Sequence, residues 1–353
     1  MRPPFNKSHI NRALNPNDGG DFNLIKISVT RINLPLKINK TGPFNLAKVS
    51  KEYSYFSHLL NSIVKDSIGE LPDFSGDSKI AIMSDFGGEH PGARFNTYAF
   101  LFLAYNKAVL FEQKVKQLRE KHHIIVPYSE FAYKKLKSGP RSRALIEYLD
   151  LVDHFVHGAI ITIAIDKRIE TVFGAEREQV HPIMEDHLLE EGLGEWKGHA
   201  AEKILRVTHI ISAFTALLTQ ENQKVFWYSD NDLINEDAKK RDFTHTQQIL
   251  SRVLDMYMPH KLDILGVGKS FDEKGHLDDL LSVTDLAAGV VQDLLLQHET
   301  RKGVPGGNEK AEVMRWIATP AKYLSKITIQ ITRTTNGEIA YGKVNMAINK
   351  NNQ

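Results

Sequence analysis

The chain has 353 residues, of which 42% are hydrophobic and 25% are charged, so it is long enough to bury a sizeable core. Its 45 Lys and Arg nearly balance 43 Asp and Glu, and a formal net charge of +2 excludes a whole-molecule field that attracts polyanions. The absence of cysteine excludes disulfides and thiolate metal sites, which leaves carboxylates and imidazoles as metal ligands. Without a signal-peptide pattern or an apolar run long enough to cross a bilayer, we expect a cytoplasmic protein with no membrane association.

The first 75 residues form an N-terminal accessory segment in our interpretation. Residues 1 to about 22 have the Pro, Asn and Gly content of an arm or an irregular loop. Apolar and polar residues then alternate from Leu24 to Ile38, as in half-buried strands, and Tyr53 to Ile68 has the spacing of an amphipathic helix. We expect a protein partner, if the chain has one, to bind through this β/α segment.

Short apolar runs separated by helical stretches begin at Lys79, a pattern typical of a central sheet covered by helices. The expected strands are Ile80 to Met83, Thr97 to Ala104, Ile124 to Val126, Ala159 to Ile165, Val225 to Tyr228 and Leu262 to Val267. The expected helices are Lys107 to Lys121, Ala200 to Leu218, a stretch ending near Tyr257, and Leu277 to Gln297. We therefore predict an α/β domain at about 76–300, with an insertion of unassigned role at about 170–200.

The C-terminal extension, 301–353, carries the pattern of a β-hairpin. Two apolar runs, Ile327 to Thr332 and Ile339 to Ala347, flank the dipeptide Asn336-Gly337. Because this dipeptide favours positive φ angles, it predicts a type I′ turn between two antiparallel strands.

Asp85 is the most informative residue, because it ends an apolar strand beside Gly87 and Gly88. A strand holds a carboxylate rigidly at the edge of a sheet, and glycines allow a ligand to approach the backbone. Turn chemistry explains an Asp-Gly segment equally well, so Asp85 needs companions to count as a metal ligand.

Two further acidic positions follow expected strands. Glu130 lies after the third strand, where Ser129-Glu130-Phe131 would open a helix, and an acid at a helix start is also favoured by the helix dipole. Asp230 follows the apolar run from Val225 directly, and Asp232 is a reserve ligand that a turn could also explain.

Asp285 lies in the helical stretch around Leu280 to Leu295, which is apolar on most faces and is therefore expected to be buried. A buried carboxylate costs several kcal/mol unless a cation, a strong donor or a water-lined cleft compensates it. The alternative is that Asp285 faces solvent through a gap in the pattern.

Four carboxylates at three strand ends and one helix are the hard oxygen ligands that Mg²⁺ or Mn²⁺ requires. Two-metal hydrolysis of phosphodiester bonds uses such ligands to hold two ions ~4 Å apart. The order of these positions resembles a large, mostly uncharacterised group of bacterial RNase H-like proteins. The resemblance rests on Ser84-Asp85-Phe-Gly-Gly, Ser129-Glu130-Phe, Ser229-Asp230 and Ser282-Val-Thr-Asp285-Leu-Ala-Ala-Gly, and covers about residues 79–298.

That resemblance implies an RNase H-like fold, a central mixed sheet flanked by helices, with a metal-dependent nuclease site at Asp85, Glu130, Asp230 and Asp285. The chain departs from the group's usual motifs at three positions. Phe86 and Gly87 stand where the group tends to have Glu and Ser, and Ser282 where it tends to have Gln. No presumed ligand is lost through these differences.

Other motifs match less well. Leu265-Gly-Val-Gly-Lys-Ser270 resembles the end of a phosphate-binding loop, but Asp263 stands where that motif needs Gly. His181, Glu185, Asp186 and His187 lack the spacing of a zinc-binding helix and are typical of a solvated surface.

Basic residues flank Glu130, and five of them are candidates for contact with a nucleic-acid backbone: Lys134, Lys135, Lys137, Arg141 and Arg143. The simpler interpretation is a solvated helix face. We expect a metal-dependent nuclease acting on DNA or RNA, in bacterial defence or a mobile element. The alternative is a non-catalytic RNase H-like module that binds nucleic acid or protein within a complex.

Overall fold

The computed structural model describes residues 39–50, 53–126, 128–137, 139–271, 274–301 and 307–346. The arm expected at residues 1–22 and the strands expected at Leu24 to Ile38 lie outside the described residues. Among the described residues, no helix has the length and apolar character needed to span a membrane.

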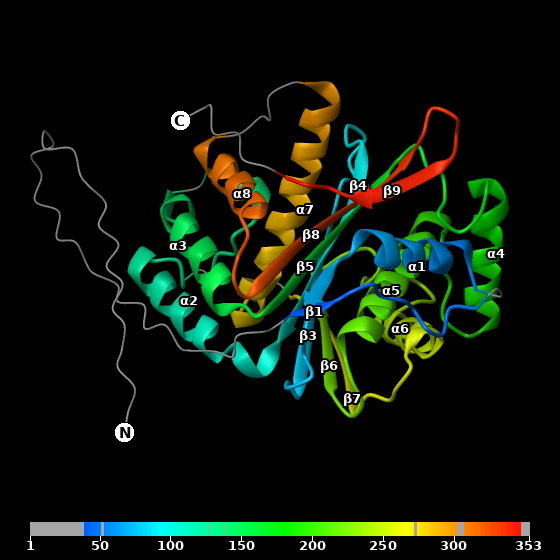
Figure 1. Cartoon of the computed structure of the whole chain (residues 1–353), viewed down its shortest axis with the longest axis horizontal. Coiled ribbons are helices and arrows are strands. Elements are labelled where there is room, and N and C mark those ends of the chain that lie inside the picture. Colours follow the sequence, from blue (N-terminus) through cyan, green and yellow to red (C-terminus); the bar gives the residue numbers. More distant parts are fainter. Residues whose placement is uncertain are drawn as a thin grey trace, which may run out of the picture. The chain divides into compact units, whose positions relative to one another are not determined.

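A seven-stranded mixed sheet forms the centre of the molecule, in the order β7-β6-β3-β4-β5-β8-β9 (Figure 1). Strands β3, β4 and β5 are antiparallel neighbours, whereas β6 and β7 extend one side in parallel and β8 runs parallel to β5 on the other. The strands are β3 (Lys79–Gly87), β4 (Phe95–Ala104), β5 (Gly158–Asp166), β6 (Lys224–Ser229), β7 (Ile264–Lys269), β8 (Leu324–Arg333) and β9 (Ile339–Lys343). The predicted α/β class is therefore confirmed.

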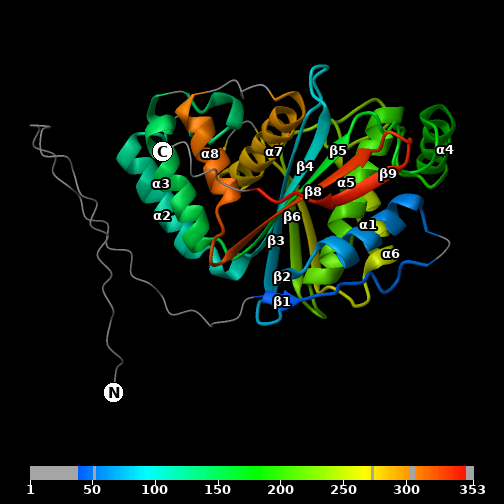
Figure 2. The ribbon, with the colours of Figure 1, turned by 45° about the horizontal axis from the view of Figure 1, so that its top comes forward.

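Helices cover both faces of this sheet (Figure 2). One face packs against α1 (Tyr55–Ser67), α4 (Arg177–Glu190), α5 (Gly198–Leu218) and α6 (Phe243–Tyr257). The other packs against α2 (Val109–His122), α3 (Gly139–Phe155), α7 (His276–Thr300) and α8 (Asn308–Ala318). Alternate residues of β3 serve the two cores, since Ile80 and Ile82 face the first and Ala81 and Met83 the second. Burial on both faces explains the continuous apolar run of this strand.

The predicted strand at Ile124 to Val126 is wrong. Helix α2 ends at His122, and the next residue, His123, has a left-handed φ of 56°. The chain then turns, with Ile124 buried and Val126 88% exposed. Because β4 already pairs with β3 on one side and β5 on the other, its edges have no place for this segment. The other predicted strands of the α/β domain are present, and most of their ends lie within two or three residues of the predicted ends.

The N-terminal elements and the C-terminal hairpin pack against the same domain. Helix α1 begins after Ser54, whose hydroxyl accepts a hydrogen bond of 3.3 Å from the Ser57 N–H, and it shares a core with α5. A two-stranded sheet of β1 (Asn39–Thr41) and β2 (Glu70–Pro72) flanks it. The domain limits at 75 and 300 stay predictions, although β8 pairs directly with β5.

The hairpin between β8 and β9 has a different turn from the predicted type I′. Arg333 pairs with Ile339, so five residues connect the strands, and the Gly337 N–H donates a hydrogen bond of 3.1 Å to the Thr334 carbonyl. Of the pair Asn336-Gly337, only Gly337 has a positive φ, at 86°. The longer loop needs one left-handed residue where a two-residue turn needs two.

Candidate functional site

Three of the predicted carboxylates meet where β3 and β6 end. The two strands are parallel and pair Ser84 with Ser229, so Asp85 and Asp230 follow this pair side by side, and the Asp230 N–H donates a hydrogen bond of 3.1 Å to the Ser84 carbonyl. Asp85 does not end its strand as predicted, because β3 stays paired with β4 as far as Gly87. Helix α7 crosses this edge with Asp285 facing Asp85. Gly87 faces Thr97 of β4, whose hydroxyl would lie 2.6 Å from a Cβ at this position, whereas Gln292 and Ala288 of α7 would lie at ordinary contact distances of 3.4 and 3.7 Å.

Asp85 and Asp285 hydrogen-bond to each other through their carboxyl groups. Backbone donors orient both: the Phe86 N–H lies 2.6 Å from Asp85 Oδ1, and the Tyr133 N–H lies 2.8 Å from Asp285 Oδ2. Burial and then the neighbouring carboxylates raise the pKa of Asp85 well above its usual range, and burial raises the pKa of Asp285 to about 6. Among the described residues, neither has an ion pair, so this half of the site lacks a compensating cation.

Lys274, which the sequence interpretation missed, lies in the other half of the site. Its ammonium is 3.4 Å from Glu130, 3.7 Å from Asp230 and 3.8 Å from Asp278. Burial raises the pKa of Asp230, and the charge of Lys274 opposes that rise. The one sequence signal for Lys274 is its position just before Asp278 and Asp279 in the first turn of α7.

Glu130 does not open a helix, contrary to the prediction. It lies in an irregular segment, residues 128–132, followed by a short 3-10 turn at Tyr133–Lys135. This segment runs along α7 and forms a series of hydrogen bonds with it: Tyr128 hydroxyl to Asp279, Phe131 N–H to Ser282, Tyr133 N–H to Asp285, and Tyr133 hydroxyl to Asp293. These bonds place Glu130 near Asp85, Asp230 and Asp285, and we call these four carboxylates and their surroundings the acidic edge. The sequence pattern of a helix start did not predict this position.

Arg119 anchors the beginning of the same segment from α2. Its guanidinium donates to Asp279, with Nε 2.9 Å away, and to the carbonyls of Ile124 and Ser129 at 3.0 and 2.8 Å. The guanidinium also lies 3.9 Å from the centre of the Tyr128 ring. Burial raises the pKa of Asp279, and Arg119 opposes the rise.

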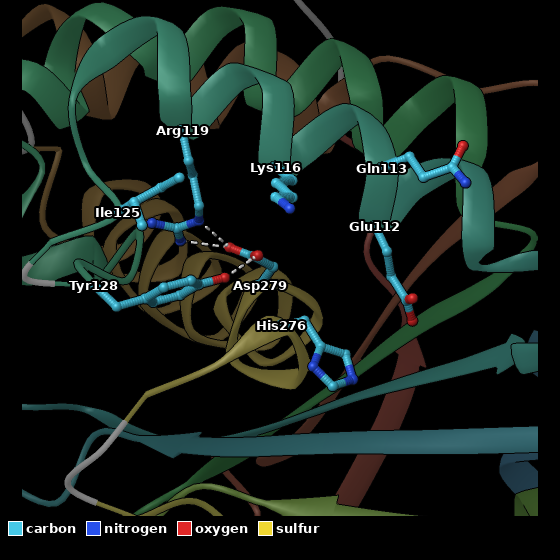
Figure 3. A pocket seen from close by; sticks show the side chains of 8 residues that line it. All are labelled: Glu112, Gln113, Lys116, Arg119, Ile125, Tyr128, His276 and Asp279. Carbon is cyan, nitrogen blue, oxygen red and sulfur yellow. Dashed lines mark hydrogen bonds and ion pairs between the residues drawn. The ribbon is translucent and has the colours of Figure 1, made fainter.

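A pocket of about 350 Å³ opens beside this ion pair, between α2 and the start of α7 (Figure 3). Figure 3 shows Arg119, Tyr128 and Asp279 joined in one corner, with His276 and Glu112 toward the opposite side. The lining residues are Glu112, Gln113, Lys116, Arg119, Ile125, Tyr128, His276 and Asp279.

Asp232, the reserve ligand, binds a different cation. Its Oδ2 lies 2.6 Å from the Lys203 ammonium, and its Oδ1 accepts a hydrogen bond of 3.1 Å from the Ile234 N–H. Lys203 is buried, and it also binds Glu89 from the turn after β3. Lys203 therefore links Glu89, in the turn after β3, to Asp232, in the loop after β6.

The five basic candidates follow the Glu130 segment. Lys134, Lys135, Lys137 and Arg143 are exposed, whereas Arg141 is half-buried. Arg141 donates a hydrogen bond of 3.1 Å to the Glu130 carbonyl, which makes it a positioning residue for that segment.

The carboxylates as they stand do not surround an ion. In the part of the chain that the structure describes, no three His, Asp or Glu side chains are grouped so as to hold a metal. The donor set still fits a hard divalent cation, since Asp85, Asp230 and Asp285 supply only carboxylate oxygens, and burial raises the pKa of all three.

Comparison with known proteins adds little to this description. No protein-family model matches the chain, and no curated protein matches it. Among solved structures, one chain of the PCNA:RNase HII complex from Archaeoglobus fulgidus is similar, with 14% identity over 70% of this chain and 93% of that chain. The TM-score of 0.31 is too low to establish a shared fold.

Proposed function

We propose that this protein is an RNase H-like nuclease that uses Mg²⁺ or Mn²⁺ to hydrolyse phosphodiester bonds of a nucleic acid. The observation that supports the proposal most directly is the contact between Asp85 and Asp285, with Asp230 beside them at one sheet edge. Two adjacent buried carboxyl groups without an ion pair either share a proton or bind a cation, and a divalent ion that replaces the proton would compensate both charges.

Each residue has a defined part in this proposal. Asp85, Glu130, Asp230 and Asp285 would hold the ions, and bound divalent ions supply an activated water and stabilise the leaving oxygen. The N–H groups of Phe86 and Tyr133 orient Asp85 and Asp285. The exposed basic residues near Glu130, including Lys134 and Lys137, would bind backbone phosphates.

The direct test incubates the full chain with single- and double-stranded DNA and RNA, in Mn²⁺, Mg²⁺ or a chelator. We expect cleavage that needs the metal and that falls by about 100-fold or more in Asp85→Asn and in Asp285→Asn. Asp263→Asn is the matched control, because this exposed acid precedes β7 at the opposite edge of the sheet. Cleavage that survives both site substitutions would rule out the proposed site.

A second candidate function is a non-catalytic RNase H-like binding module. It is favoured by the finding that, among the described residues, the acidic side chains are not grouped around a metal position. Calorimetry separates the two functions: a nuclease site takes up Mn²⁺ in a manner that depends on Asp85, and a vestigial site does not.

A further inference from the structure

The two halves of the acidic edge differ in their compensation of charge. Asp85 and Asp285 contact each other and, within the described residues, have no ion pair. Glu130 and Asp230 share the Lys274 ammonium, at 3.4 and 3.7 Å. One half is therefore open to a cation, whereas the other already contains one from the protein itself.

The position of Lys274 is set by the start of α7. The Ser270 N–H donates to the Ser229 carbonyl at 2.8 Å, which ties the end of β7 to the end of β6. Asp278 then accepts hydrogen bonds from the Ser270 hydroxyl at 2.6 Å and the Gly275 N–H at 2.7 Å. Lys274 itself donates to the Ser270 hydroxyl at 2.7 Å, so its side chain is directed along the acidic edge and is 21% exposed.

We propose that the Lys274 ammonium takes the place of one of the two divalent ions, holding Glu130 and Asp230 together in the metal-free protein. This inference rests on the proposed function. Divalent ions then load in two steps, the first at Asp85 and Asp285. The second ion needs the oxygens that Lys274 contacts, and because like charges at such distances repel strongly away from bulk water, it binds only by displacing Lys274.

Calorimetry with Mn²⁺ alone, on the full chain without nucleic acid, tests this order. The wild-type protein should bind one ion tightly and a second weakly, and Lys274→Met should tighten the second step by about tenfold or more, since methionine keeps the stem and removes the charge. Lys274→Arg keeps the charge and should keep the weak second step. Lys107→Met is the matched control, because Lys107 is 33% exposed and pairs with Asp77, which precedes β3 at the opposite end of that strand.

Thermal unfolding, in a chelator and in Mn²⁺, gives a readout that does not depend on nuclease activity. Loss of the Lys274 charge should lower the Tm in chelator, and Mn²⁺ should raise the Tm of Lys274→Met more than that of the wild type. A folded Lys274→Met protein that binds both ions as the wild type does would overturn the inference while leaving the nuclease proposal intact. Absence of Asp85-dependent Mn²⁺ binding in the wild type would overturn both.

Discussion

The Tyr133 backbone N–H lies 2.8 Å from the Asp285 carboxylate, and the hydroxyl of the same tyrosine lies 2.8 Å from Asp293, two turns further along α7. One residue thus attaches the Glu130 segment to the helix that carries Asp285. Because Glu130 and Asp285 come from elements far apart in the sequence, this attachment determines whether the two carboxylates share one site.

Gly289→Ala tests the close packing of Tyr133 on α7. A Cβ at position 289 would lie 2.3 Å from the Tyr133 ring, so we expect a loss of about 1–3 kcal/mol in unfolding free energy, although Gly to Ala within a helix normally stabilises by about 1 kcal/mol. Urea unfolding measures the change. In a Tyr133→Ala background only the Cβ of residue 133 stays close, at 3.0 Å, so the same substitution should cost less than in the wild type. Purely additive effects of the two substitutions would contradict this packing.

Arg119→Met tests the buried ion pair that anchors the Glu130 segment. Removing the guanidinium leaves Asp279 buried without its cation and frees two carbonyls, so we expect a loss of about 3–5 kcal/mol. Lys121→Met, on the same helix, removes an exposed ion pair with Glu147 and should cost less than about 1 kcal/mol. Equal losses from the two substitutions, measured by urea unfolding, would show that burial of the Arg119 pair is unimportant.

His209 should make the protein less stable in mild acid. Burial lowers the pKa of His209 to about 4, against about 6.5 in the unfolded chain, so between these values the unfolded state binds more protons. The unfolding free energy therefore decreases as pH falls below about 6.5, and this residue contributes a loss of about 1 kcal/mol between pH 7.5 and 5.5.

His209→Gln removes that contribution while keeping a polar group that can hydrogen-bond to the Tyr257 hydroxyl, which lies 2.8 Å from His209 Nδ1. Urea unfolding at the two pH values should show a smaller decrease for the variant than for the wild type. Identical decreases would mean that His209 has the same pKa in both states.

The basic residues near Glu130 should control the salt dependence of nucleic-acid binding. Changing the exposed side chains of Lys134, Lys137 and Arg143 to Gln should weaken binding and lower the slope of log K against log salt by about 2–3, because each phosphate contact releases roughly one counterion. Fluorescence anisotropy at several salt concentrations measures the slope. The matched control changes three exposed lysines at the opposite ends of the same strands: Lys79 begins β3, Lys224 begins β6 and Lys261 precedes β7. Equal effects of the two triplets would place the binding surface elsewhere.

The apolar runs of the sequence determined most of the fold. Strands such as β3 and β5 are buried on both faces, so their continuous apolar residues predict a sheet covered by helices without any knowledge of partners. Asp85 and Asp230 follow directly from the ends of such runs, and Asp285 from its place in an apolar helix.

Tertiary structure decided the rest of the site. Glu130 is placed by hydrogen bonds to α7 across about 150 positions of sequence, Asp232 binds Lys203 on a distant helix, and Lys274 reaches the acids through a loop. Local patterns record which side chains are buried, because burial repeats with the period of a strand or helix. They do not record which distant group satisfies a buried charge, because that depends on the order of strands in the sheet and on the path of α7 across their ends.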